Sequence, residues 1–157
     1  MPSDRLPEAG ALTPLEFRSR PCAGRCPWVV GTNLADFSDA DFAKLERANG
    51  TPDCQAGPES PSMACHLDQP GTAHPLRLCA GWLAVVGHHH HGVILSVLAG
   101  RLPETVLEPG DGWPELHSGL DTMIAERALW QKSLAQLTPT TSTADRAGAP
   151  ETDATLR

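Results

Sequence analysis

Apolar residues recur at helical spacing in three parts of the chain. The clearest helix start lies between Phe37 and Phe42, where Ser38 can cap the free backbone N–H groups and the two phenylalanines can pack together. Two aspartates in the first turn favour the positive end of the helix dipole. Apolar residues continue the same face until Gly50, which is typical of a helix end. The pattern predicts a helix over Asp39–Asn49.

A second apolar stripe follows in the middle of the chain, with the i, i+3, i+4, i+7 spacing of a helix packed on a core. It consists of Cys79, Trp82, Leu83 and Val86. This helix is expected to point Cys79 inward. Val93–Ala99 is apolar and predicts a buried second helix that ends at Gly100.

The last predicted helix covers about Ser118–Leu137, and its inward residues are expected to be Leu120, Met123 and Ile124. Thr51–Pro61 contains three prolines and reads as an exposed loop, whereas Ser62–Leu67 is a short strand or an extended segment. We therefore expect a mainly α fold with short extended segments, a small α+β protein.

The two ends of the chain lack sustained periodicity. Residues 1–20 are interpreted as an irregular arm. Residues 138–157 contain a single aliphatic residue, Leu156, and cannot bury enough apolar surface to offset their ordering entropy, which predicts a disordered tail. The folded domain is then expected over residues 21–137, with its helices packed around a metal site.

Charge and cysteine content narrow the function. The chain of 157 residues has a formal net charge of -7 and no basic patch, which argues against nucleic acid as a partner. It shows no secretory signal and no apolar run near the length of a membrane span, so we expect a soluble, cytoplasmic protein. In a reducing compartment, five cysteines indicate metal binding or thiol chemistry rather than a disulfide framework.

The segment Pro21-Cys22-Ala23-Gly24-Arg25-Cys26-Pro27-Trp28 is the most informative motif. Gly24 and the flanking prolines disfavour a helix and predict a loop. Such a loop can wrap a metal or a cluster while its backbone N–H groups point at the thiolates. The Cys22 and Cys26 pair looks exposed in this context.

Two further cysteines, Cys65 and Cys79, lie in ordered surroundings and complete a set of four, the number that a closed zinc site or an iron–sulfur cluster requires. His66 could replace a sulfur ligand or hydrogen-bond to one. Cys54 lies in the proline-rich loop and is left out. Cys-x3-Cys spacing favours an iron–sulfur cluster slightly over zinc, because zinc sites prefer tighter Cys-x2-Cys turns.

Other interpretations of these residues stay open. Cys65 and Cys79 could be small core hydrophobes, and Cys22 with Cys26 could form a redox dithiol. The run His88, His89, His90 and His91 could bind a transition metal, but it fits a solvated junction between two helices better.

The chain resembles an uncharacterised family of small four-cysteine proteins of actinobacteria and their phages, a domain of unknown function. The resemblance covers about Arg20–Met123 and rests on the Cys22–Trp28 motif, Ala64-Cys65-His66, Cys79-Ala80-Gly81-Trp82-Leu83 and Gly100-Arg101-Leu102-Pro103. The family pattern usually has two residues between the first two cysteines, where this chain has three. The resemblance implies a shared four-cysteine site and an actinobacterial origin, and no reaction.

No nucleophile elbow, phosphate-binding loop or zinc-protease motif occurs in the sequence, so whether the protein is an enzyme stays undecided. The first hypothesis is a regulatory, sensor or accessory protein with an iron–sulfur cluster or zinc and a protein partner. A redox enzyme or biosynthetic accessory that uses the thiols or cluster is the second. The third is a structural zinc module for protein–protein interaction.

Overall fold

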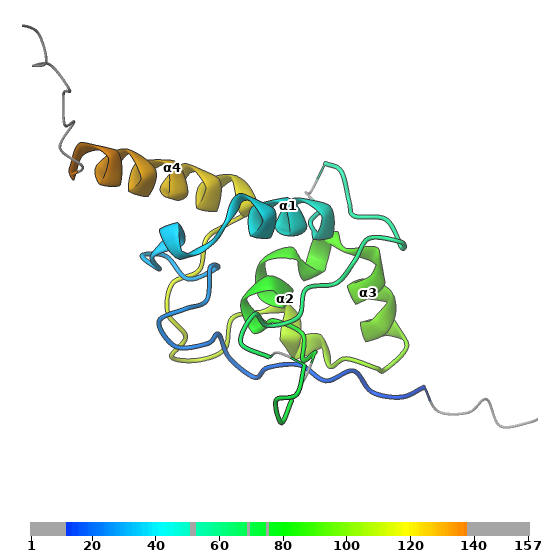
Figure 1. Ribbon diagram of the computed structural model, residues 1–157. Helices are drawn as coiled ribbons and strands as arrows, with labels where there is room; N and C mark the ends of the chain where they lie inside the picture. The colour runs from blue at the N-terminus through cyan, green and yellow to red at the C-terminus, as the bar shows by residue number, and fades with distance from the viewer. Residues whose placement is uncertain (1–11, 51–52, 69, 75, 138–157) are drawn as a thin grey trace, which may run out of the picture.

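The computed structural model describes residues 12–50, 53–68, 70–74 and 76–137 (Figure 1). This part of the chain contains four α-helices and three short 3-10 helices. The α-helices are α1 (Asp39–Ala48), α2 (Ala80–Val86), α3 (His91–Leu98) and α4 (Leu120–Leu137). The 3-10 helices are η1 (Leu34–Asp36), η2 (Gly87–His89) and η3 (Glu104–Leu107).

Helix α1 begins with a reciprocal cap. The Ser38 hydroxyl accepts a 3.2 Å hydrogen bond from the backbone N–H of Asp41, and the Asp41 carboxylate accepts one of 3.0 Å from the backbone N–H of Ser38. The helix then buries Phe42, Leu45 and Ala48 against the core. The predicted helix over Asp39–Asn49 is therefore confirmed, with Asn49 as its C-terminal cap.

Helix α2 lies at the centre of the molecule, and α3 follows it through η2 at one side (Figure 1). Trp82 and Leu83 of α2 are fully buried, and Val93 of α3 packs into the same core. The indole N–H of Trp82 donates to the side-chain oxygen of Asn49, so the buried polar edge of the ring has a partner.

Three extended segments meet at Leu78 without forming a strand in the described residues. Leu78 bridges Phe17 in a parallel sense and Ala64 in an antiparallel sense. The backbone of Arg18 donates to the carbonyl of Leu78, and the N–H of Cys65 donates to the carbonyl of Arg77. Leu78 thereby brings together segments that are distant in the sequence.

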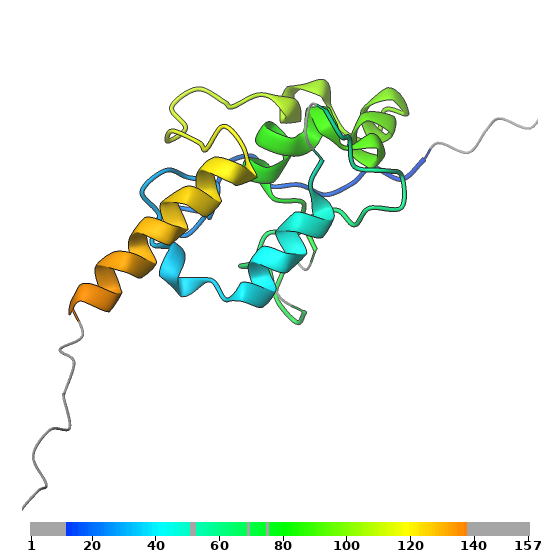
Figure 2. The ribbon, with the colours of Figure 1, turned by 90° about the horizontal axis from the view of Figure 1, so that it is seen from above.

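Helix α4 starts on the body of the molecule and runs outward from it (Figures 1 and 2). Met123 is buried, and the guanidinium of Arg127 lies 4.2 Å above the ring of Phe42 while it pairs with Asp39 at 2.7 Å. Farther along, the large apolar residues Leu129, Leu134 and Leu137 are exposed. These contacts hold only the first half of α4 against α1.

The described part of the chain is mainly helical, with short extended segments, as the sequence predicts. Two details differ. Ile124 is exposed rather than inward, because only one side of α4 meets the body. Cys79 is buried as expected but precedes α2 in an extended conformation, where it is the N-terminal cap residue.

Some expectations concern residues outside the described part. The predicted disordered tail, residues 138–157, and the first eleven residues of the predicted arm lie there. Within the rest of that arm, Leu15 and Phe17 pack against the core. No helix in the described residues is both long enough and apolar enough to cross a bilayer.

Candidate metal centre

Four of the five cysteines come from three separate segments and lie in one buried cluster. The exposed fractions are 4% for Cys22, 0% for Cys26, 1% for Cys65 and 6% for Cys79, and all four are free thiols. Cys54 is exposed, as its loop position predicts. The expectation that Cys22 and Cys26 are exposed is wrong, because Trp28 and the α2 helix cover them.

The first two cysteines lie on a tight turn. The backbone N–H of Cys26 donates to the carbonyl of Cys22 at 3.3 Å, and Gly24 has a φ of +66°, a value that disfavours residues with a side chain. The hydroxyl of Thr32 then holds the carbonyl of Cys26 at 2.9 Å. The predicted loop is confirmed, and it fixes both thiols on the inner side of the turn.

The other two cysteines are positioned by the extended segments around Leu78. The Ala64–Leu78 bridge is antiparallel, so Cys65 lies opposite Arg77 and Cys79 lies opposite Met63, which makes the two cysteines diagonal neighbours on one face of the pairing. The N–H of Cys79 completes the pairing by donating to the carbonyl of Met63 at 2.9 Å. Local backbone pairing thus aligns two sulfurs fourteen residues apart.

The thiols interact directly with one another. The pKa of Cys22 is lowered to about 6, chiefly because the thiol of Cys26 hydrogen-bonds to its sulfur, and Cys65 and Arg18 lower it further. The pKa of Cys26 is raised for the converse reason, as it hydrogen-bonds to both Cys22 and Cys79. The pKa of Cys79 is lowered by Cys26. The two thiols with a lowered pKa, Cys22 and Cys79, are therefore the ones that favour the thiolate form, and both neighbour Cys26, whose pKa is raised.

Backbone N–H groups also favour the thiolate form at each of the four sulfurs, and at Cys22 the group is its own N–H. The N–H of Trp28 favours the thiolate of Cys26, that of Leu67 favours Cys65, and those of Trp82 and Gly81 favour Cys79. Despite this, burial raises the pKa of Cys65. Amide hydrogen bonds to sulfur offset the negative charge of metal-bound thiolates and tune the metal that they hold.

One group of ligand atoms is close enough to hold a single metal ion. The thiols of Cys22 and Cys65 and a ring nitrogen of His66 all lie within 4.8 Å of one another. The pKa of His66 is lowered, first by burial and then by the charges of Arg25 and Arg18. A lowered pKa keeps the imidazole neutral at physiological pH, and the neutral form is the one that binds metals.

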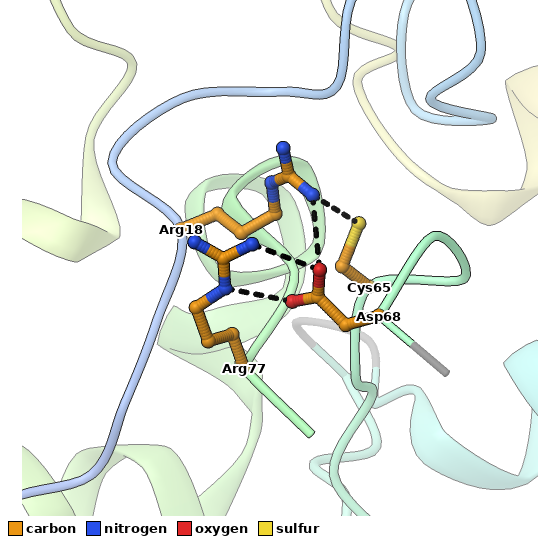
Figure 3. Close-up of polar contacts among 4 residues, drawn as sticks. All are labelled: Arg18, Cys65, Asp68 and Arg77. Carbon is orange, nitrogen blue, oxygen red and sulfur yellow. Dashed lines mark hydrogen bonds and ion pairs between the residues drawn. The ribbon is translucent and has the colours of Figure 1, made fainter. Parts of the chain in front are cut away.

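An arginine lies directly against this group. Nη1 of Arg18 donates to the sulfur of Cys65 at 3.4 Å and to the carboxylate of Asp68 at 3.2 Å (Figure 3). Arg77 donates to both oxygens of the same carboxylate at 2.8 and 2.9 Å. The pKa of Asp68 is lowered, mainly by Arg77, so the carboxylate stays charged.

A cavity of about 460 Å³ opens beside the cluster. Its walls include Cys65, His66 and Cys79, together with Phe37 and Leu45. The cavity gives small solutes a route to one side of the thiols.

The structure brings together all four cysteines that sequence reasoning selected, and His66 with them. The histidine run agrees with the expected solvated junction at His88 and His91, which are exposed, but not at His90. His90 is buried, caps α3 and contacts the ring of Trp82, whereas His88 is exposed. In the described residues this run contributes to no group spaced for a metal ion.

Sequence reasoning missed Arg18, Asp68 and Arg77. Arg18 lies in the segment assigned to an irregular arm, and no motif spacing connects it to Cys65, 47 residues away. The available signal was the pair of arginines flanking the cysteine motifs in an acidic chain.

Comparison with known proteins assigns the chain to a family. Residues 17–139 match the model of DUF6283, a family of unknown function, and the chain belongs to this family. The matched range includes Arg18 and all of the candidate site. No curated protein and no solved structure matches the chain.

Proposed function

We propose that this protein binds a metal centre through Cys22, Cys26, Cys65 and Cys79, with His66 beside them, and that it has a regulatory, sensor or accessory role. The observation that carries the proposal is the burial of four free, neighbouring thiols from three segments. Cysteine is often buried as a small hydrophobe. Ordinary core packing does not account for backbone N–H groups that favour the thiolate at all four sulfurs.

The ligand set depends on the metal. A zinc ion with sulfur ligands at 2.3 Å holds them about 3.8 Å apart, which suits the compact group of Cys22, Cys65 and His66. Cys26 and Cys79 extend the set on the other side of Cys22. Engaging all four cysteines at once favours a wider, polynuclear centre, so an iron–sulfur cluster is our first candidate and zinc the alternative.

The surroundings support a regulatory or accessory role. The site combines thiols with a neutral histidine and a neighbouring cavity of about 460 Å³, through which a small oxidant or ligand could reach the centre. The exposed apolar residues of α4, Leu129, Leu134 and Leu137, offer contact area to a protein partner. We place the protein in the cytoplasm, where thiols stay reduced.

The test is metal and sulfide analysis of protein purified without oxygen. We expect iron with acid-labile sulfide, or else zinc, in a fixed ratio to the chain. Ser substitutions at Cys22, Cys26, Cys65 and Cys79 should each lower the metal content, whereas Cys54→Ser, at the exposed cysteine, should leave it unchanged. Full metal content in all four buried-cysteine variants would refute the proposal.

A second substitution separates the two metals. If a cluster is bound by four thiolates, His66→Ala should keep iron and sulfide while Cys26→Ser and Cys79→Ser lose them. If zinc is bound by the compact group, His66→Ala should lose zinc. The pattern of loss therefore identifies the ligands as well as the metal.

A thiol redox function at Cys22 and Cys26 is the second candidate. The supporting observation is that their thiols are hydrogen-bonded on a single turn. With glutathione disulfide as the oxidant, the two thiols would form one disulfide and release two molecules of glutathione. A Cys22–Cys26 disulfide found by mass spectrometry after such treatment, in protein purified metal-free, would favour this function.

A further inference from the structure

Arg18 makes an unusual pair of contacts with a single nitrogen. Nη1 carries two hydrogens, and its two acceptors are the sulfur of Cys65 at 3.4 Å and Oδ1 of Asp68 at 3.2 Å. Figure 3 shows the guanidinium placed between the thiol and the carboxylate. The carboxylate thus fixes the direction in which Arg18 presents its other hydrogen to sulfur.

Asp68 does not need Arg18 to be satisfied. Arg77 already donates to both of its oxygens, at 2.8 Å from Nε and 2.9 Å from Nη2. Such a two-pronged pair is the strongest arrangement of arginine and carboxylate. A second arginine on the same carboxylate adds one positive charge in excess, and that charge lies against the thiol cluster.

The backbone holds this arrangement in place. The N–H of Arg18 donates to the carbonyl of Leu78, while the N–H of Asp68 donates to the carbonyl of Cys65. The side chain of Asp68 is only 5% exposed, and each of the two arginines is 25% exposed. Arg18 therefore cannot move away from Cys65 without breaking a partly buried ion pair.

The excess positive charge would stabilise the thiolates of a metal centre. Several thiolates on one ion or cluster leave a net negative charge, which is costly in a buried site unless cations or N–H groups compensate it. Arg18 is the cation seen in direct contact with a sulfur of the cluster in the described residues.

We propose that Arg18, held by Asp68 and Arg77, is a positioning residue that compensates the charge of the metal-bound thiolate at Cys65 and thereby sets the affinity and electronic properties of the centre. This inference rests on the proposed function. Residues that hydrogen-bond to metal ligands typically change metal affinity about tenfold to hundredfold when they are removed.

The experiment uses cobalt(II) as the probe, added without oxygen to the metal-free full chain. Cobalt bound by thiolates gives a sulfur-to-metal charge-transfer band, and competition with a chelator gives the dissociation constant. Arg18→Met should weaken binding about tenfold to hundredfold. The band should also move to longer wavelength, because a sulfur without its N–H donor gives up an electron more easily. Arg18→Lys keeps the charge and should recover part of both effects.

Arg127→Met is the matched control. Arg127 is also partly buried, pairs with an aspartate at 2.7 Å and lies over an aromatic ring, but it is on α4. The Arg127→Met substitution should lower the melting temperature and leave the cobalt affinity and the charge-transfer band unchanged. If Arg18→Met does not fold, Arg18→Gln gives the same test, because it removes the positive charge while keeping an N–H donor, and it should weaken cobalt binding.

The outcomes distinguish the two proposals. Wild-type affinity and band position in a folded Arg18→Met or Arg18→Gln protein would overturn the role of Arg18 and leave the metal site intact. A wild-type chain that takes up neither cobalt, iron nor zinc would overturn the proposed function, and the inference about Arg18 with it.

Discussion

The backbone N–H of Cys65 donates a 2.8 Å hydrogen bond to the carbonyl of Arg77. This one bond joins the thiol cluster to the ion pairs around Asp68, because Arg77 also holds Asp68 with its side chain. The candidate centre and its charged support are therefore parts of a single backbone arrangement. A change that disturbs the pairing at Leu78 should affect both.

Gly81 is expected to tolerate no side chain. A Cβ atom there would come within 2.8 Å of Cβ of Trp28 and 3.0 Å of the sulfur of Cys26. Alanine is the better helix former by about 1 kcal/mol, but overpacking a rigid core costs about 1–3 kcal/mol, so the clash should dominate. We expect Gly81→Ala to reduce the free energy of unfolding, measured with urea, and to lower the metal content.

Gly57→Ala is the control for this substitution. A Cβ atom at Gly57 would meet nothing within 4 Å. The stability and metal content of the Gly57→Ala protein should therefore match those of the wild type. Equal stability of the Gly57 and Gly81 variants would show that α2 and the Cys26 turn are not packed as described.

Ser38→Ala should destabilise the protein by about 1 kcal/mol, because it removes the acceptor for the N–H of Asp41 at the start of α1. Thermal or urea unfolding at neutral pH measures the change. Ser133→Ala is the comparison, since Ser133 lies inside α4 and its hydroxyl only donates to the carbonyl of Leu129. Alanine there should be neutral or slightly stabilising. A Ser38 variant as stable as the wild type would contradict the cap.

Local patterns were enough to predict the helices. The Ser38 cap and the spacing of Trp82, Leu83 and Val86 depend only on residues within two helical turns, and the structure confirms both elements. Ile124 was assigned wrongly because periodicity shows which residues share a face and does not show where the body ends along α4.

The thiol cluster was partly predictable for a different reason. Cysteine has few uses in a reducing compartment, so the four selected residues could be grouped by chemistry before any contact was known. Arginine has many uses, and the position of Arg18 depends on long-range pairing at Leu78. The sequence contains no local signal for such pairing, and the charged support was missed for that reason.

Asn49→Ala should expose the role of the C-terminal cap of α1. The indole N–H of buried Trp82 donates to the Asn49 side chain at 3.2 Å, and removing that acceptor leaves a buried donor unpaired. The expected loss of unfolding free energy is about 1–3 kcal/mol. Asn49→Asp retains an acceptor of the same shape and should lose less. Equal losses in the two variants would argue against this hydrogen bond.

The cap of α1 should also make stability depend on pH. The pKa of Asp41 is lowered, first by hydrogen bonds from the Ser38 hydroxyl and backbone N–H, and further by Lys44. A carboxylate with a lower pKa in the folded state stabilises the fold above its unfolded pKa, about 3.9, and this contribution is lost as the pH falls through the folded pKa. The Asp41 side chain is 43% exposed, so solvent screening limits the contribution to below about 1 kcal/mol.

Urea unfolding from pH 7 to pH 3 should show wild type more stable than Asp41→Asn at neutral pH, with the difference in unfolding free energy shrinking below pH 4. Asp111→Asn, at an exposed aspartate outside this helix, is the matched control. A gap for Asp41→Asn that stays constant or widens as the pH falls would mean that the charged carboxylate does not support the helix start.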